Sequence, residues 1–347
     1  MIFRYLFTRV LLSFVMVLSG FVLLEFILSG LNELTYQTRH DYQALQAFEF
    51  LLHSTPARIS QFGPSILLLS ILVGLGSLAS SSELTVLRAS GISVARIIAM
   101  AMTPLLLVYA LLFTLGEFWA PKLLQQANIT KAALRQERQI GGWHREQNWL
   151  LHAERIEREE LQSVMLYQLN ADFTQLEGIF HAQSAEAVAD GWLLKQVRER
   201  RFSERPFREH SHAQWHLPFK ADAELMTARV MDPRSLTLTQ NLRFLQYMQQ
   251  QRLAADALAF SFWQRIYMPL LAVMMMFAGA TFVFGSNRSM AMSSRIFIGL
   301  VAGILLQLLQ DLLAPLSQVV SWPIPVVTAI PLFISLAIAL HLTRKVS

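Results

Sequence analysis

Charged side chains inside hydrophobic segments are the residues of this sequence that most need a chemical explanation. Glu25, Arg265 and Asp311 lie within long apolar runs, and Arg58 and Glu117 lie close to the ends of such runs. A charge in the hydrocarbon of a membrane is costly unless it faces a water-filled cavity, a ligand or a partner of opposite charge. The five residues therefore indicate either one polar cavity open to one side, or a set of snorkelling residues and internal salt bridges.

Motifs for catalysis are missing from the sequence. None of the lysines stands in a phosphate-binding G-x-x-x-x-G-K-[ST] loop, and neither a G-x-S-x-G elbow nor an H-E-x-x-H pair occurs. The lack of cysteine excludes disulfides, cysteine-ligated zinc, iron–sulfur clusters and thiol catalysis. We therefore predict a non-catalytic protein that binds no cofactor itself and draws its energy from a partner or from a gradient.

Three histidines invite comparison with a metal site. His210, His212 and His216 share one face if their segment is a strand. No carboxylate or further histidine at a suitable spacing completes a set of ligands around them. We interpret them as a solvated strand face and predict no metal.

The elements that position the charged residues are six apolar runs. Hydrophobic residues make up 54% of the 347 residues and charged residues only 15%. A helix needs about 20 mostly apolar residues to cross a membrane. The first run is too long for the core of a cleaved signal peptide, so we expect it to be an anchor. The runs are 10–31, 59–79, 97–119, 266–284 with an approach helix from about residue 258, 296–320 and 323–342.

Positive charge is concentrated in the short segments at one end of these runs. Those segments carry seven arginines and one lysine against the single acid Glu83, which predicts cytoplasmic N- and C-termini. The long central segment then lies outside, and its own charges nearly balance. The net charge of +5 thus reports topology, and a nucleic-acid partner is not expected.

A short segment between the second and third runs has the pattern of a helix. Ser80 with Glu83 fits a capping box, and Gly91 fits a C-terminal stop, so we predict a helix over 80–91. Leu84, Leu87 and Arg88 would share one face. A docking element for a cytoplasmic partner has these features.

The central segment changes to the pattern of β-structure. Residues 164–169 and 192–197 are short strand-like runs, and 149–156, 178–188 and 211–219 are weaker ones. We predict a mainly β domain, a sandwich or jelly roll, followed by a helix with Thr237 and Gln240 as a second capping box. The predicted organisation is 1–121 with three spans and the helix 80–91, 122–257 with the β-domain, and 258–347 with three spans.

Several local stretches carry a resemblance to a known family. They are Leu75-Gly76, Ser82-Glu83-Leu84, Ala89-Ser90-Gly91, Gly116-Glu117-Phe118-Trp119-Ala120-Pro121, Asp311 with Pro315-Leu316, and Pro323-Ile324-Pro325. Together with the layout of three spans, inserted domain and three spans, they resemble the permeases of the lipopolysaccharide export complex, the LptF/LptG (YjgP/YjgQ) family. The Ala-Ser-Gly end of the helix between spans two and three and the Gly-Glu-(aromatic)-x-Ala-Pro end of the third span are more similar to the LptG branch.

The resemblance implies an ABC exporter in the bacterial inner membrane. This chain and an LptF-like permease would enclose a cavity, an LptB-like ATPase dimer would use the ATP, and an LptC-like bitopic protein would begin a periplasmic bridge. The substrate would be lipopolysaccharide or lipooligosaccharide, taken from the outer leaflet and passed through a periplasmic jellyroll-like domain. In such permeases the helix between spans two and three docks on the ATPase, which assigns that contact here to Glu83, Leu84, Leu87 and Arg88.

One departure from the family concerns the residues that would meet lipid phosphates. LptG relatives carry lysines after the first span, whereas residues 29–37 here contain no base and include Glu33. Arg39, Lys122 and Lys131 are the alternative cations. The residues expected near the lipid are Glu25, Glu33, Arg39, Arg58, Glu117, Lys122, Lys131, Arg265 and Asp311.

Two other functions fit the same residues. Glu25 and Asp311 would carry protons in a gradient-driven secondary transporter, which would work without an ATPase. A membrane-tethered scaffold would use only the outer domain. For Glu83, a purely structural capping role competes with a contact to the ATPase.

Overall fold

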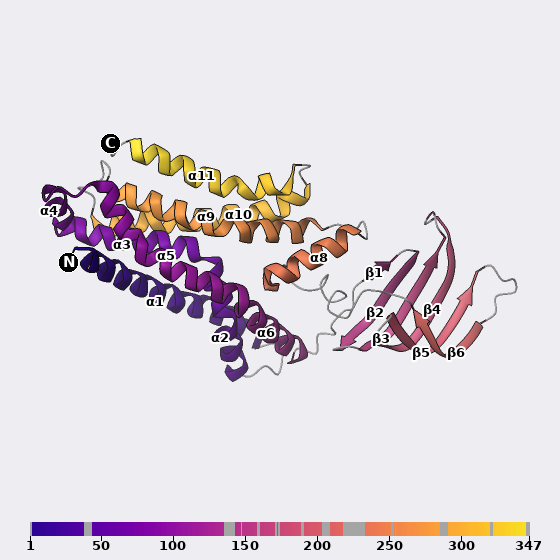
Figure 1. The fold of residues 1–347 in the computed structure, drawn as a ribbon. Coiled ribbons are helices and arrows are strands. Elements are labelled where there is room, and N and C mark those ends of the chain that lie inside the picture. The colour runs from indigo at the N-terminus through magenta and orange to yellow at the C-terminus, as the bar shows by residue number, and fades with distance from the viewer. Residues whose placement is uncertain are drawn as a thin grey trace. The chain divides into compact units, whose positions relative to one another are not determined.

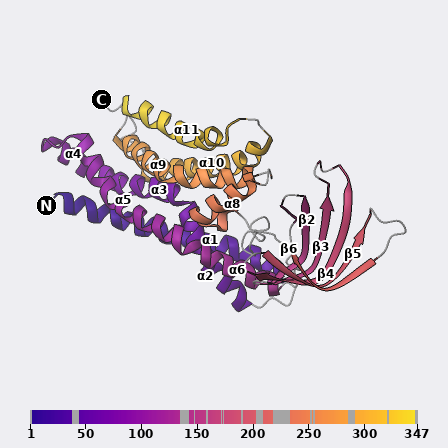
Figure 2. The ribbon, with the colours of Figure 1, turned by 45° about the vertical axis from the view of Figure 1, so that its right-hand side comes forward.

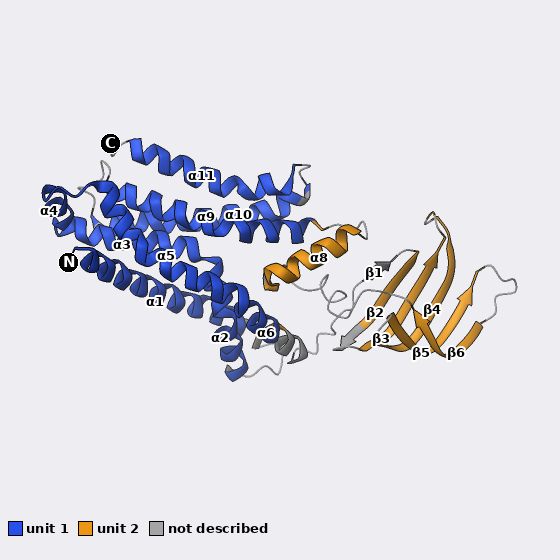
Figure 3. Ribbon diagram, in the orientation of Figure 1, with its two compact units in different colours: residues 1–127, 256–347 blue, residues 128–255 orange. Residues whose placement is uncertain are grey.

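The computed structural model describes most of the chain as helices and one sheet (Figure 1). The described residues are 2–37, 44–134, 143–146, 148–157, 160–170, 172, 174–188, 191–202, 209–217, 233–250, 253, 255–284, 291–319 and 322–344. They divide into two compact units, residues 1–127 with 256–347 and residues 128–255 (Figure 3). The boundaries predicted from the sequence lie at 121/122 and 257/258.

The first unit is helical, and six of its helices are long and apolar enough to cross a membrane, which confirms the six predicted spans. Its further helices are α2 (Ala44–Gln61), α4 (Glu83–Ala89) and the start of α6 (Ala120–Leu134). The spanning helices are α1 (Ile2–Gln37), α3 (Gly63–Ser80), α5 (Val94–Phe118), α9 (Asp256–Phe284), α10 (Met292–Val319) and α11 (Ile324–Arg344).

The second predicted run crosses a break between two helices. It begins at residue 59, whereas the structure ends α2 at Gln61 and begins α3 at Gly63. Pro64 lies in the first turn of α3, where its missing N–H breaks no intrahelical bond. The fourth predicted run and its approach helix are one continuous helix, α9.

Helix α3 lies at the centre of the membrane unit. It packs against α1, α5, α9 and α10, and 72% of its apolar window is buried, compared with 17% for α1. Glycines of α9 and α10 make the close packing possible, because a Cβ atom at Gly279 would lie 2.7 Å from Ile71 Cγ2 and one at Gly299 would lie 2.4 Å from Leu72 Cδ1. A movement of α3 must therefore displace several neighbouring helices.

The second unit contains a six-stranded antiparallel sheet whose strands follow one another in sequence order. The mainly β insertion is thus confirmed, and the five predicted strands fall within or largely overlap β2 to β6. The first strand was missed because four residues are too few for an alternating pattern. The strands are β1 (Trp143–Glu146), β2 (Trp149–Glu157), β3 (Glu160–Leu169), β4 (Leu176–Val188), β5 (Gly191–Arg201) and β6 (Glu209–Leu217).

The sheet is strongly curved, as Figure 2 shows. The rings of Trp149 on β2 and Trp215 on β6 lie 5.5 Å apart, and both contact Phe180 on β4. In a flat sheet, strands four positions apart would be separated by about 19 Å. The curvature brings these rings together on the concave face. The described strands form one sheet in sequence order, so the two packed sheets of the predicted sandwich are not found among the described residues.

The last described elements of this unit are the short helix η1 (Pro233–Ser235) and helix α8 (Leu238–Gln250). The capping box predicted for α8 is confirmed. The Gln240 N–H donates to Thr237 Oγ1 at 3.2 Å, and the Thr237 N–H donates to Gln240 Oε1 at 3.1 Å. These reciprocal bonds fix the start of the helix.

Candidate functional site

Helix α4 is a short connection between α3 and α5 whose two ends are built differently. At its C-terminus Gly91 has a φ of +86°, the Gly91 N–H donates to Arg88 O at 3.0 Å and the Ile92 N–H donates to Leu87 O at 3.4 Å. These two bonds are those of a Schellman motif, so the predicted stop at Gly91 is confirmed.

The capping box predicted at the start of this helix is wrong. Ser80 is still part of α3, and its hydroxyl donates to Ser77 O at 2.8 Å. The residue before α4 is Ser82, which has a φ of +63° and makes no capping bond with its side chain. Glu83 is therefore the first residue of α4, and its carboxylate does not cap the helix.

The Glu83 carboxylate is instead held by two hydroxyl groups. Tyr5, on α1, donates to Oε2 at 2.5 Å, and Ser81 donates to Oε1 at 2.8 Å. Arg9 Nε donates to the Tyr5 hydroxyl at 3.0 Å, and its guanidinium lies 5.3 Å from the centre of the Tyr5 ring. The hydrogen bond from Tyr5, followed by that from Ser81, lowers the pKa of Glu83, and the charge on Arg9 adds to this. The carboxylate is ionised at neutral pH.

The four residues predicted to dock a partner differ in how far they are exposed on α4. Leu84 is 6% exposed and belongs to the hydrophobic core, and Leu87 is half-buried against that core. Arg88 is exposed. Val86, which was not predicted, is 67% exposed and lies about one helical turn after Glu83. The side chains of α4 that a partner could reach therefore include an acid, a base and one apolar residue, which lie on different sides of the helix.

The charged residues of the spans form two ion pairs between helices. Arg58 on α2 pairs with Glu25 on α1, and Ser29 donates to the same carboxylate at 2.5 Å. Arg265 on α9 pairs with Glu117 on α5, with 3.2 Å between Nη1 and Oε2. Pairing of Glu25 with Arg265, left open by the sequence, is not found. Four of the five charges first considered are thus held within the chain.

A close helix contact joins the two ion pairs. A Cβ atom at Gly116 would lie 2.3 Å from the Ser60 hydroxyl, so α5 and α2 meet at these two residues. Ser60 follows Arg58 by two positions, and Gly116 precedes Glu117. The helices α1, α2, α5 and α9 are therefore linked in series, at the ends of the spans that lie away from α4.

The other residues predicted to lie near the lipid take no part in these two ion pairs. Asp311 is exposed on α10 and accepts hydrogen bonds from Gln307 at 3.2 Å. Glu33 is 5% exposed on α1, and Lys122 is exposed on α6. Arg39 and the side chain of Lys131 lie outside the described residues.

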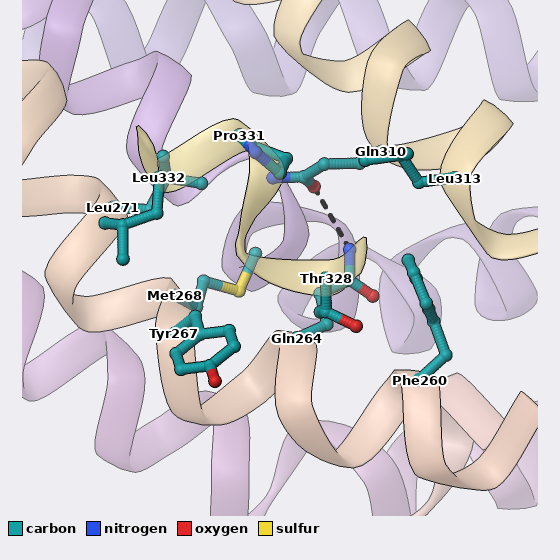
Figure 4. Close-up of a pocket in the computed structure, with 10 residues that line it drawn as sticks. All are labelled: Phe260, Gln264, Tyr267, Met268, Leu271, Gln310, Leu313, Thr328, Pro331 and Leu332. Carbon is teal, nitrogen blue, oxygen red and sulfur yellow. Dashed lines mark hydrogen bonds between the residues drawn. The ribbon is translucent and has the colours of Figure 1, made fainter. Parts of the chain in front are cut away.

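A cavity lies between α9, α10 and α11 (Figure 4). Gln264 Nε2 donates to Gln310 Oε1 at 3.1 Å across it, and Thr328 and Pro331 of α11 complete the wall. The open space is about 10 Å³, enough for about one water molecule. It is too small for a lipid, and its polar pair is better suited to holding α9 against α10.

The three histidines considered as metal ligands, His210, His212 and His216, lie on β6, and their side chains are exposed as predicted. His212 Nε2 lies 2.8 Å from Glu199 Oε2 on β5, and Arg201 binds the other carboxylate oxygen. Among the described residues no group of three possible ligands could hold a metal. Burial of Glu199 raises its pKa. The hydrogen bonds and charges of Arg201 and His212 lower it by more, so the net shift of the pKa is downward.

Replacing Glu199 with glutamine tests this cluster. A lowered folded pKa contributes stability above the unfolded value of about 4.3, and that stability is lost as the pH falls through the folded pKa. We expect Glu199→Gln to cost about 1–3 kcal/mol at pH 7 and much less at pH 3. Hydrogen exchange of the β5 amides in the full chain measures this. Glu186→Gln is the matched control on an exposed pair, and an equal cost of the two variants would contradict the role of Glu199.

Comparison with known proteins identifies the family of this chain. The family model described as lipopolysaccharide export system permease LptF/LptG matches residues 4–345. The chain belongs to the LptF/LptG family. It is 27% identical over 317 residues to lipopolysaccharide export system permease protein LptG of Escherichia coli K12, covering 88% of this chain and 87% of that protein. It is 25% identical over 272 residues to the LptG protein of Haemophilus influenzae, covering 76% of each.

As a member of the LptF/LptG family the chain is a multi-pass membrane permease. Two residues that bind the Glu83 carboxylate, Tyr5 and Ser81, were not predicted from the sequence. Tyr5 and Glu83 are separated by 78 positions, so no local pattern connects them. Ser81 sits in a run of three serines whose individual roles cannot be distinguished by type. Contacts between helices, which only the fold supplies, identify both.

Proposed function

We propose that this LptF/LptG permease is a transmembrane subunit of an ABC-type exporter. It works with an LptF-like permease and an LptB-like ATPase dimer, and it takes lipopolysaccharide or lipooligosaccharide from the outer leaflet of the inner membrane. The lipid passes to a periplasmic bridge that begins with an LptC-like protein. The permease itself is non-catalytic, because the ATP is hydrolysed on the separate subunit.

The observation that carries this proposal is the construction of α4. Its first residue presents an ionised carboxylate, and its Leu84 side chain is embedded in the core. Helix α4 follows α3 after two residues, and α3 is the most buried span. A partner that pulls or pushes on α4 therefore acts directly on α3 and on the helices packed around it. This is the mechanical requirement for converting ATP hydrolysis at a separate subunit into movement of the spans.

The charge distribution supports the orientation that this function needs. With α4 on the cytoplasmic side, the arginines near it and the C-terminal Arg344 follow the positive-inside rule. The curved sheet then belongs to the periplasmic side. Its concave face, lined by Trp149, Phe180 and Trp215, suits a lipid that carries acyl chains.

The ion pairs at the other ends of the spans support contact with a charged lipid. Arg58 is the more accessible cation, since its side chain is 38% exposed compared with 17% for Arg265. A lipid phosphate could replace the Glu25 carboxylate as its partner with similar charge-assisted bonds. Lys122 is a second exposed cation.

Co-purification from a detergent extract tests the proposal. We expect the tagged chain to bring down an ATPase in two copies and a second six-span permease, and the recovered complex to hydrolyse ATP faster when lipopolysaccharide is added. A secondary transporter that carries protons on Glu25 and Asp311 would instead move its substrate alone in vesicles with a proton gradient. Isolation of an active chain without any ATPase would overturn the exporter.

A further inference from the structure

A chain of polar contacts connects the first span to the coupling helix. Arg9 Nε–H donates to the Tyr5 hydroxyl at 3.0 Å, and the Tyr5 O–H donates to Glu83 Oε2 at 2.5 Å. Ser81 binds the other carboxylate oxygen at 2.8 Å. Figure 1 shows the start of α1 and the helix α4 at the same end of the membrane unit.

Hydrophobic contacts, rather than these polar ones, hold α1 against the rest of the membrane unit. The packing of α1 rests on Leu6, Val10 and Phe14, which are 0%, 0% and 4% exposed and belong to the same core as Leu84. Tyr5 is 39% exposed. Polar contacts at such accessible positions add little to stability. Their effect is to restrict the Glu83 side chain to one rotamer.

The Glu83 carboxylate can still accept hydrogen bonds from a partner protein. Two carboxylate oxygens offer about four acceptor sites, and the two hydroxyl donors occupy one on each oxygen. Both donors are neutral, and the Arg9 guanidinium binds the Tyr5 hydroxyl and acts on the Glu83 charge from behind it, so both carboxylate oxygens remain able to accept from a further cation. A side chain that is already ordered loses less entropy when a partner binds it, which increases affinity.

We infer that Tyr5 is a positioning residue for the coupling contact, which presents the Glu83 carboxylate to a cation of the ATPase in a fixed geometry. The inference rests on the proposed function. It makes α1, and not only the helix between α3 and α5, part of the docking surface. Arg9 strengthens the donor, since a hydroxyl that accepts from a guanidinium is a better donor in turn.

Tyr5→Phe tests the inference, because it removes the hydroxyl and keeps the ring. We expect the apparent affinity of the purified permease pair for its cognate ATPase to fall about threefold to tenfold, the size of one ordinary hydrogen bond, because Tyr5 acts on the contact only through Glu83. The thermal unfolding midpoint of the permease pair should stay unchanged. Thr8→Val is the matched control on the same helix, because the Thr8 hydroxyl donates only to Arg4 O at 2.9 Å.

A double variant separates positioning from other effects. In a Glu83→Ala background, Tyr5→Phe should cause no further loss of affinity, because the hydroxyl has no carboxylate to position. A further loss of the same size in that background would show that Tyr5 acts elsewhere and would overturn the inference. Wild-type affinity of Tyr5→Phe, with reduced affinity of Glu83→Gln, would also overturn it while leaving the proposed function intact. Wild-type affinity of both Glu83→Gln and Glu83→Ala would overturn the coupling role of Glu83 itself.

Discussion

Replacement of Arg265 with methionine is expected to destabilise the membrane unit by roughly 3 kcal/mol, the lower end of the range for breaking a buried ion pair. The variant removes the cation that lies 3.2 Å from Glu117 and leaves that carboxylate in a poorly hydrated position. The side chains of the pair are only 17% and 15% exposed, so water can compensate for little of the loss. The measurement is unfolding of the purified permease in detergent.

A comparison within the chain makes this prediction specific. Arg58→Met breaks the other pair. Glu25 is only 12% exposed, but it keeps the hydrogen bond from Ser29, and Arg58 itself is 38% exposed, so we expect a smaller cost of about 1–2 kcal/mol. The double variant Arg265→Met/Glu117→Gln should recover most of the lost stability, because no buried charge is left over. Equal costs for Arg265→Met and Arg58→Met, or no recovery in the double variant, would show that the pair does not hold α5 against α9.

The difference between the two pairs bears on transport. Under the proposed function, a cation that is partly open to its surroundings, such as Arg58, can exchange its carboxylate partner for a lipid phosphate, whereas the less exposed Arg265 serves to fix helices. We therefore expect Arg58→Met to impair lipid release more than folding, and Arg265→Met to impair folding more than release. The series of contacts through Ser60 and Gly116 would transmit an opening at one pair to the other.

Hydropathy was sufficient to predict the spans, because the membrane imposes one length and one composition on every helix that crosses it. The missed helix α2 shows the limit of that signal. Residues 44–61 include Glu49, His53 and Arg58, and they do not form an apolar run. Their helix is stabilised by contacts with α1 and α5, which no local pattern contains.

Strand β3 was predicted only over 164–169, the part that follows Ser163, for a definite physical reason. In β3 the buried side is Leu161 before Ser163 and Val164 after it, so the alternation changes phase. Ser163 has a φ of +52°, and Gln196 in β5, where the same change occurs, has a φ of +51°. Such irregularities bend the sheet and interrupt the period of two on which strand prediction depends.

The partners of the charged residues could not be predicted at all. Glu25 and Arg58 are 33 positions apart, and Glu117 and Arg265 are 148 positions apart, so both pairings depend on which helices pack together. The capping box at Ser80 failed for a related reason. The hydrogen bonds of α3 continue to Ser80, and the serine is used within that helix before it can cap the next one.

Removal of the charge on Glu83 is the substitution with the largest expected effect on function. Glu83→Gln keeps an acceptor for Tyr5 and Ser81 but cannot attract a cation of the ATPase. Truncating or neutralising one member of a charge pair at an interface typically costs 2 kcal/mol or more, so we expect recovery of the ATPase to fall about 30-fold. Glu83→Ala should be at least as severe, since it also leaves the two hydroxyl donors without their acceptor.

The two variants also distinguish a contact from a structural role. If Glu83 served only to order the turn between α3 and α4, glutamine would preserve that role and Glu83→Gln would assemble like the wild type. Glu209→Gln, an exposed glutamate of β6, is the control for the loss of a charge in the other unit and should leave assembly unchanged. The carboxylate is bound by hydroxyl donors from Tyr5 and Ser81, and Glu83 is only partly buried, so its charge remains accessible to a partner. The loss of that charge should therefore separate the ATPase from the spans without unfolding them.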